Sequence, residues 1–295
     1  MSHYDIVFVG YLGTYKVVPF DGPSSVESGG PVFFCVAAAS CFLKRIGMVT
    51  RVSENEANLV ELLKEAGIDL FMQRRETPRY RVVFPTAKVD ERQVFLVKGG
   101  EHFVINDMPP IEPCLIHLAG WHIHEFPLEF MHALKARGFR LSVDMQAFMF
   151  QADSKTGALY IEDVPDKKEI LGMADFVKLD AVEAKILTGT EVLQDQADIL
   201  EDWGSSETVI TSSNGVMVKS KGRTVLAEFN NRSNQGRMGR GDTVMGAYLA
   251  CRLDHSIEES LRFAAALTSI KLESAGPFKG SLEDVNARLC QPGRF

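Results

Sequence analysis

Short apolar runs alternate with longer, partly polar segments over most of the chain. The runs have the length of single strands, and the segments between them carry apolar residues at helical spacing. We expect strands at 6–10, 48–52, 115–120, 141–144, 175–179 and 207–211, and helices at 32–46, 56–66, 127–137, 167–173 and 182–187. This alternation predicts an α/β fold, a three-layer sandwich whose mostly parallel central sheet is covered by helices on both faces.

The pattern changes between about residues 68 and 104. Two β-rich runs, 79–85 and 93–98, are separated by a polar turn and predict an antiparallel hairpin. The stretch 14–19 is also β-prone and could join them. We therefore expect a small β sheet, formed by about 13–28 and 68–104, that is inserted into a single domain of residues 1–295 and lies over it as a lid.

Polar residues close several of the predicted parallel strands. Asp144, Asp180 and Thr211 each stand at the carboxyl end of such a strand. Ligands of open α/β sheets bind beyond the carboxyl ends of the strands. These three side chains are therefore expected on the rim of a ligand site.

Length and charge narrow the range of functions. A chain of 295 residues with 45% hydrophobic content can bury one large core. The net charge of −7 argues against a nucleic-acid partner, because such surfaces carry a basic patch. An anionic ligand would need a local positive site built from backbone N–H groups, a helix N-terminus and a few cations.

The five cysteines are scattered, odd in number and without a CxxC pair, which suits a reducing compartment rather than a disulfide framework or a zinc ribbon. The N-terminus shows no signal peptide, and no stretch approaches the ~18 apolar residues needed to cross a bilayer. We expect a cytoplasmic protein without a membrane partner.

A glycine-rich block at 236–242 carries the strongest chemical signal. Its glycines let the backbone turn sharply and aim consecutive N–H groups into one concavity, to which the following helix adds the positive end of its dipole. Asp242 at the end of the block could accept the proton of an attacking hydroxyl while a phosphoryl group occupies the concavity. Asp242 could equally be the N-cap of the helix, and the block alone leaves both interpretations open.

Residues 234–249 resemble the second signature of the ribokinase (PfkB-type) carbohydrate kinase family. Further matches to this family follow in the right order along the chain: 28–30, 45–47, 174–189 and 209–215. The resemblance implies a ribokinase-like fold and an ATP-dependent kinase that phosphorylates a hydroxyl of a small molecule.

The resemblance also implies roles for residues on the phosphate side. Asp242 would be the base that deprotonates the acceptor hydroxyl. The backbone of the three residues before it would form the anion hole: Gly239, Arg240 and Gly241. Residues on two neighbouring strands and the loop after them would bind the nucleotide: Lys178, Thr211, Ser213 and Gly215. The adenine ring would lie against 225–230 and small residues of the C-terminal region: Ala265, Thr268, Ser269 and Gly276.

Two further groups follow from the same resemblance. Asp180 and Glu183 would hold Mg²⁺ through water. The acceptor would contact residues near the ends of two other strands: Gly29, Gly30, Asp144 and Gln146. The inserted sheet would close over the acceptor, exclude water and serve as the contact of a homodimer.

The sequence departs from the family pattern at several places. Arg240 replaces an alanine, Asp180 replaces an asparagine, and the usual acceptor-binding Asp near Gly10 and Asn after Gly30 are absent. The segments 143–148 and 271–278 resemble the inositol-kinase-like branch, which favours a cyclitol or an unusual sugar as acceptor. A nucleoside kinase, and a small-molecule-binding protein without catalysis, stay open as alternatives.

Other charged or metal-ligating side chains allow two interpretations each. The Arg237 and Arg240 guanidinium groups could neutralise phosphate charge or could face solvent. His122 and His124 have the spacing of a metal site on a strand, but they lack a third ligand at matching spacing, so a substrate-facing or structural histidine is favoured.

Overall fold

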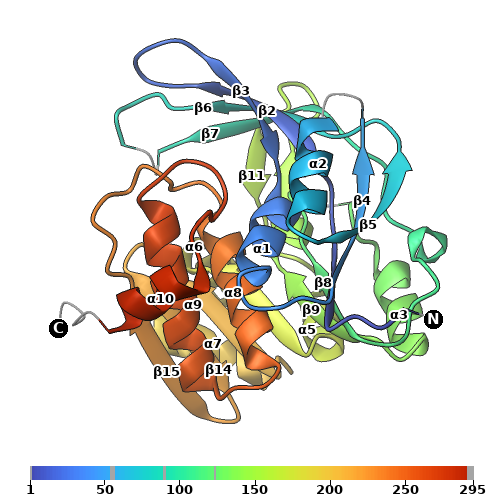
Figure 1. Ribbon diagram of the computed structural model, residues 1–295, viewed down its shortest axis with the longest axis vertical. Coiled ribbons are helices and arrows are strands. Elements are labelled where there is room, and N and C mark those ends of the chain that lie inside the picture. The colour runs from blue at the N-terminus through green and yellow to red at the C-terminus, as the bar shows by residue number, and fades with distance from the viewer. Residues whose placement is uncertain (1, 54–56, 89–90, 123, 291–295) are drawn as a thin grey trace.

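The computed structural model describes residues 2–53, 57–88, 91–122 and 124–290. Its main element is a nine-stranded sheet of these residues, parallel except for two antiparallel strands at one edge (Figure 1). The strands lie in the order β15 (Arg223–Glu228), β14 (Gly215–Ser220), β13 (Glu207–Thr211), β12 (Phe176–Asp180), β9 (Arg140–Asp144), β8 (Leu115–Leu118), β1 (Ile6–Val9), β4 (Ile46–Val52) and β5 (Asp69–Arg74). The predicted α/β fold is confirmed.

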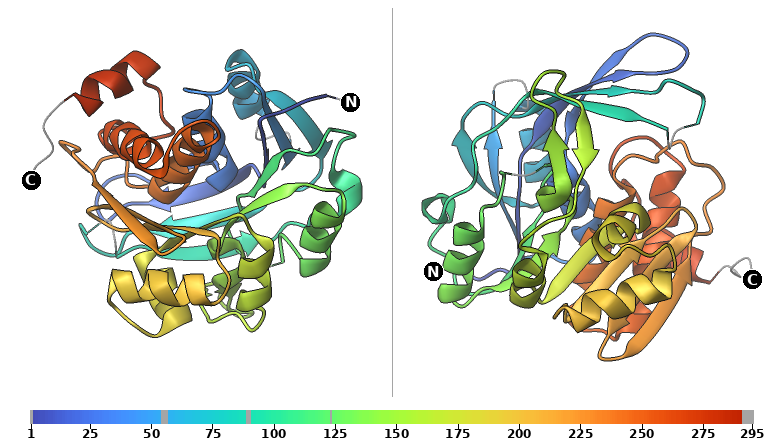
Figure 2. Two further views of the ribbon diagram at one scale, coloured as in Figure 1. Left: turned by 90° about the horizontal axis from the view of Figure 1, so that it is seen from below. Right: turned by 180° about the vertical axis from the view of Figure 1, so that it is seen from behind.

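Helices cover both faces of this sheet, as the view from below shows (Figure 2). One face packs against α1 (Pro31–Ala39), α2 (Ala57–Glu65), α8 (Arg240–Arg252), α9 (Ile257–Leu272) and α10 (Leu282–Leu289). The other face packs against α3 (Leu128–Ala136), α5 (Lys167–Met173), α6 (Ala181–Thr188) and α7 (Leu193–Asp202). Each interface has its own hydrophobic core, which gives the three layers that the alternation of elements predicts.

A smaller sheet lies over one end of the sandwich (Figure 1). It consists of β3 (Ser25–Gly29), β2 (Gly13–Val18), β6 (Arg79–Val83) and β7 (Gln93–Lys98), and β6 and β7 form the predicted antiparallel hairpin. A second hairpin, β10 (Phe150–Ala152) and β11 (Leu159–Ile161), joins it where Leu96 N–H donates to the Gly157 carbonyl at 2.7 Å. We call these six strands the lid.

The lid is smaller on one side than its predicted range. Residues 69–74 form β5, which pairs in parallel with β4 at the edge of the main sheet, so the range 68–104 was too wide. This segment follows α2 and completes one more β–α–β crossover, a connection that places its second strand beside the first. Among the described residues, the strands that lie over the sandwich are β2, β3, β6, β7, β10 and β11.

One predicted helix is corrected, and another lies partly outside the described residues. The helix expected at 32–46 ends at Ala39, because the chain turns at 40–45 to enter β4, and the Ser40 hydroxyl donates to the Ala37 carbonyl at this end. The helix expected at 56–66 is α2, and residue 56 lies outside the described residues.

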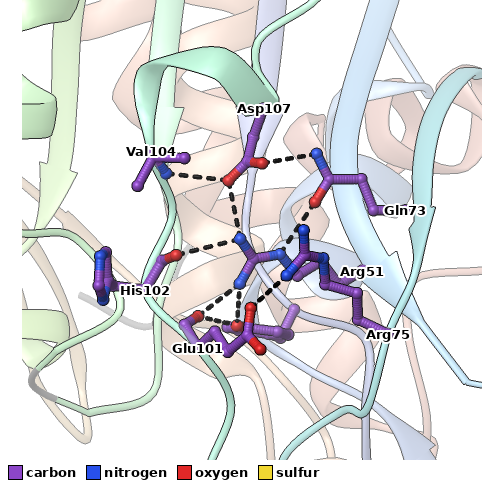
Figure 3. Close-up of polar contacts among 8 residues, drawn as sticks. Arg51, Gln73, Arg75, Glu101, His102, Val104 and Asp107 are labelled. Atoms are coloured by element: carbon purple, nitrogen blue, oxygen red, sulfur yellow. Dashed lines mark hydrogen bonds and ion pairs between the residues drawn. The ribbon is translucent and has the colours of Figure 1, made fainter.

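A buried arginine ties three segments together near the carboxyl ends of β4 and β5 (Figure 3). Arg51 is 2% exposed and donates to Gln73 Oε1 on β5 at 3.1 Å and to Asp107 Oδ2 at 2.7 Å. It also donates to the carbonyls of Glu101 and His102, at 2.6 and 3.0 Å. Charge-assisted bonds of this kind fix the segment 101–107, which includes the 3₁₀ turn η2 (Ile105–Asp107), against the sheet.

Candidate active site

The glycine-rich block forms the start of α8 and faces the carboxyl ends of the central strands. Gly239 is the residue before the helix and has φ 74°, a left-handed conformation. A Cβ there would lie 2.4 Å from the Phe34 ring, so only glycine fits. Asp242 is the third residue of the helix, so it does not occupy the N-cap position. The helix-cap interpretation of Asp242 is therefore wrong.

The block lies directly against two neighbouring strands of the sheet. A Cβ at Gly241 would lie 3.0 Å from Lys178 Nζ and 3.6 Å from Thr211 Oγ1, so the glycine backbone rests directly on these two side chains. Thr211 closes β13 and Lys178 lies on the neighbouring β12. The first N–H groups of a helix lack partners within the helix, which makes a helix start such as that of α8 a common place for an anion to bind.

Lys178 is held by an ion pair inside the protein. Its Nζ lies 2.9 and 3.1 Å from the two carboxylate oxygens of Asp144 at the end of β9, and Asp144 is 1% exposed. Burial raises the pKa of Asp144 to about 6, although the Lys178 ammonium opposes the shift. Burial alone would lower the pKa of Lys178, but the negative charges around it together outweigh this effect and raise that pKa; they belong to Asp144, Glu183, Asp242 and Asp180. Asp144 thus accepts hydrogen bonds from both the Lys178 ammonium group and the Gln146 N–H.

Asp242 is half-buried in the first turn of α8. Burial raises the pKa of its carboxyl group, and the positive charges of Lys178 and Lys271 partly oppose the shift. A carboxylate with a raised pKa binds a proton more strongly than an exposed one does. Such a carboxylate is suited to accepting a proton, as a general base does.

Asp180 and Glu183 form a capping box at the start of α6. Asp180 Oδ1 accepts from the N–H groups of Val182 and Glu183 at 2.8 and 2.9 Å, and Glu183 accepts from the Asp180 N–H at 2.7 Å. Burial, followed by the charge of Asp180, raises the pKa of Glu183 to about 8, and Lys178 opposes the shift. The box places the Asp180 side chain at the rim while Glu183 stays inside.

A cavity of about 790 Å³ opens between this rim and the lid. Five of the predicted site residues line it: Gln146, Asp180, Thr211, Ser213 and Arg240. Arg237 lines it as well, and Arg240 is only 7% exposed, so the solvent-facing interpretation of Arg240 is wrong. Gly215 lies beneath this site at the start of β14, where a Cβ would lie 2.4 Å from the Ala227 carbonyl oxygen.

Arg92 and Trp121 are among the lining residues that the sequence did not indicate. Arg92 comes from the loop before β7, and Trp121 follows the glycine that ends the β8 run. Trp121 stacks on Tyr80 of the lid, with ring centres 4.3 Å apart. Its position just beyond the end of a parallel strand was the signal that could have found it.

The part of the cavity wall next to Gly30, where the sequence predicts the substrate, contains an indole N–H that has no hydrogen-bond acceptor. Trp121 Nε1 is closed off from solvent and has no hydrogen-bond partner among the described residues. A Cβ at Gly30 would lie 3.2 Å from this nitrogen, and one at Gly29 would lie 3.5 Å from the Tyr15 hydroxyl. The two glycines thus leave room beside a polar aromatic wall.

His122 is a structural residue. Its Nδ1 lies 2.9 Å from Glu125 Oε1 and 3.1 Å from the Tyr80 hydroxyl, and His122 lies in a bend and His124 in a turn, not in a strand. Within the described ranges, no three His, Cys, Asp or Glu side chains gather as a metal site would require.

A model of the pfkB family of carbohydrate kinases matches residues 29–284, which include the glycine block and the strands that carry the site. The chain belongs to this family. A ribokinase from Haemophilus influenzae is 30% identical over 115 residues, which is 37% of this chain and 38% of that protein, so the match spans less than two fifths of the relative.

Solved structures extend the similarity to the whole fold. A sulfate complex of a pyrophosphate-dependent kinase in the ribokinase family is 28% identical, with a TM-score of 0.87 over 96% of this chain and 99% of that chain. A pyrophosphate-dependent kinase of this family, complexed with a pyrophosphate analogue and myo-inositol, is 27% identical with a TM-score of 0.86 over 96% and 99%. Arabidopsis thaliana ribokinase with ribose and ATP shares the fold at 17% identity and a TM-score of 0.72, over 99% and 100%.

The region that would hold adenine in this pfkB member is cross-linked by hydrogen bonds. The Asn230 N–H donates to Ser269 Oγ at 2.9 Å. Arg288 on α10 donates to the Asn230 carbonyl at 3.2 Å and to Glu273 at 2.9 Å. These bonds join the end of β15, the end of α9 and α10 along the wall predicted for the base.

No helix in the described part of the chain combines the length and apolar character of a membrane span.

Proposed function

We propose that the protein transfers a phosphoryl group from a polyphosphate donor to a hydroxyl of a small polyol, sugar or cyclitol, with Asp242 as the general base. The observation that supports this most is the place of Asp242. It lies half-buried in the first turn of α8, next to the backbone N–H groups of 239–241, where an anion and a proton acceptor are both needed.

In this reaction the acceptor oxygen attacks the terminal phosphorus while Asp242 takes the hydroxyl proton. The bond from phosphorus to the bridging oxygen breaks, and the remaining phosphate leaves with the bonding electrons. The N–H groups of 239–241 and the Arg237 and Arg240 guanidinium groups are the donors that meet the growing negative charge. Lid closure over the cavity excludes water, which would otherwise compete as acceptor.

Mg²⁺ fits the oxygen side chains at the rim. Asp180, Thr211 and Ser213 line the cavity with carboxylate and hydroxyl oxygens, the donors that this ion prefers. Few carboxylates gather there, so Asp180 and Glu183 would hold the ion largely through water and the donor's phosphates, as Mg²⁺ commonly binds. The bound ion would neutralise phosphate charge.

A ring bearing hydroxyl groups suits the acceptor end. The Trp121 N–H lacks an acceptor and lies beside Gly30, and a substrate hydroxyl would supply one. The indole and Tyr80 rings offer an apolar face for the C–H side of a polyol ring. This wall, together with the myo-inositol complex of a similar kinase, favours a cyclitol as the phosphoryl acceptor.

We infer that the phosphoryl donor is inorganic pyrophosphate rather than ATP, which is the donor expected from the sequence. Three arginines, Arg92, Arg237 and Arg240, line the cavity, which suits a compact and highly charged anion. The hydrogen bonds of Arg288 and Ser269 occupy polar groups along the adenine wall. Two of the similar kinases described above, at 28% and 27% identity, are pyrophosphate-dependent.

The test combines donors, acceptors and a matched variant. Mg²⁺ with pyrophosphate or ATP is offered with inositols, sugars and nucleosides, and the phosphorylated product is followed for wild type, Asp242→Asn and the exposed control Asp202→Asn. We expect a cyclitol or sugar to react with pyrophosphate, Asp242→Asn to lose at least about 100-fold in kcat, and the control to match wild type. Binding without turnover would favour the non-catalytic alternative, and turnover of nucleosides alone would favour a nucleoside kinase.

We also propose that two copies associate through the lid. The β2–β3 hairpin carries Phe20 and Val26, which are 62% and 70% exposed and would be covered in a dimer. Light scattering of wild type and of the double variant Phe20→Ser, Val26→Ser tests this, since only wild type should show the dimer mass.

A further inference from the structure

A lysine is buried behind the loop that leads into α8. Lys271 lies in the last turn of α9 and is 1% exposed. Its ammonium group donates hydrogen bonds to the backbone carbonyls of Gly236 and Met238, and it lies 5.0 Å from the centre of the Phe34 ring on α1. Its partners are therefore uncharged carbonyl oxygens and an aromatic face, the surroundings that also bind small free cations.

The loop is held closely at both ends of this contact. The Gly236 N–H donates to the Leu272 carbonyl at 2.8 Å, and a Cβ at Gly236 would lie 2.0 Å from the Ser274 carbonyl oxygen. At the other end, Gly239 lies against the Phe34 ring. The loop thus has no room to shift toward α9 or α1.

By binding these two carbonyl groups, Lys271 also fixes the direction of the N–H groups in the same peptides of the anion-hole loop. In a planar trans peptide, the N–H points opposite to the C=O of the preceding residue. Because the Met238 carbonyl is turned toward Lys271, the Gly239 N–H of the same peptide points away from it. The Gly236 carbonyl fixes the Arg237 N–H in the same way.

Lys271 also acts on Asp242 through charge. Burial lowers the pKa of Lys271 to about 8, the negative charge of Asp242 on α8 opposes the shift, and Arg237 in the loop adds to it. The Lys271 charge in turn opposes the raised pKa of Asp242. The ammonium group therefore stabilises both the loop geometry and the ionised base.

On the basis of the proposed function, we propose that Lys271 is a positioning residue that serves as a built-in monovalent cation. Its ammonium group takes the place of a bound potassium or ammonium ion in organising the anion-hole loop. Wild-type turnover then needs no added monovalent cation. Removing the ammonium group leaves the carbonyls of Gly236 and Met238 without a cation, and a small cation can fill the space.

The test measures turnover of wild type, Lys271→Met and Lys271→Ala in choline, potassium and ammonium chloride at equal ionic strength. We expect wild type to vary by less than about twofold among the salts. Lys271→Met should lose about 100-fold in kcat, on the scale of a lost oxyanion donor, with the acceptor KM changed by less than about threefold. Lys271→Ala should regain at least about tenfold in ammonium or potassium but not in choline.

Wild-type turnover that depends on potassium or ammonium overturns the proposal, whatever the variants do. So does a folded Lys271→Met with nearly full kcat, or a folded Lys271→Ala that no cation restores. A second readout is independent of catalysis: ammonium should raise the unfolding temperature of Lys271→Ala more than that of wild type. If wild type turns over nothing, the proposed function fails while this readout still decides the role of Lys271.

Discussion

Three buried, positively charged side chains each hold separate segments of this protein together. Arg51, Lys178 and Lys271 are each almost fully covered, and each is surrounded by carboxylates, amide oxygens or backbone carbonyls. A buried charge is tolerated only where such partners replace water. At each place the cation joins segments that are distant in the chain, so its loss should be felt beyond the substituted side chain.

We expect Arg51→Met to lower the free energy of unfolding by about 3–5 kcal/mol, because it leaves the Asp107 carboxylate buried without its cation. Arg75→Met is the matched control: Arg75 pairs with Glu101 next to the same cluster, but the two side chains are 49% and 68% exposed, so its loss should cost less than about 1 kcal/mol. Urea unfolding at neutral pH measures both, and equal losses would contradict the assigned role of Arg51.

At the scale of elements, the start of α8 is fixed by how closely this helix crosses α1. A Cβ at Gly246 would lie 2.1 Å from the Cys35 carbonyl oxygen, so the two backbones are in direct contact. This contact sets how far the Asp242 end of α8 extends over the sheet. Packing between helices thus decides the position of the base.

We expect Gly246→Ala to destabilise the protein by about 1–3 kcal/mol, because the added methyl group forces α1 and α8 apart. Gly172→Ala, in α5, has nothing within 4 Å of the new Cβ and should stabilise the protein by about 0.5–1 kcal/mol through helix propensity. Chemical denaturation compares the two. A neutral effect at Gly246 would show that the crossing can open without cost.

At the scale of the whole molecule, several buried carboxyl groups should shape the dependence of stability on pH. Burial raises the pKa of Asp144 to about 6 and that of Glu183 to about 8, and it raises that of Asp242. Between an unfolded pKa near 4 and these values, the folded state binds protons that the unfolded state has released. Stability present at low pH is then lost as pH rises through the folded pKa values.

We therefore expect the free energy of unfolding, measured without Mg²⁺ or donor, to fall between about pH 5 and pH 8 at about 1 kcal/mol per pH unit for each carboxyl involved. Glu183→Gln keeps an acceptor for the Asp180 N–H but cannot titrate, so its stability should fall less steeply over this range. Urea unfolding at several pH values tests this. An unchanged slope in Glu183→Gln would show that Glu183 is already ionised in the folded protein at pH 5.

The sequence by itself determined the alternation of strands and helices, the β6–β7 hairpin and the glycine block, because each depends on spacing within a short window. It also indicated the family, through motifs in a fixed order. It left undecided whether Asp242 is a helix cap, because that depends on where α8 begins, which the left-handed Gly239 settles.

The tertiary structure alone decided which distant residues meet. The membership of β5 in the main sheet depends on its pairing with β4, and the hairpin β10–β11 is too short for a periodic signal. Trp121 becomes part of the site by stacking on Tyr80, 41 positions earlier in the chain. Lys271 meets the Gly236 carbonyl across 35 positions, a contact that no local pattern encodes, since it exists only once α9 packs beside the loop.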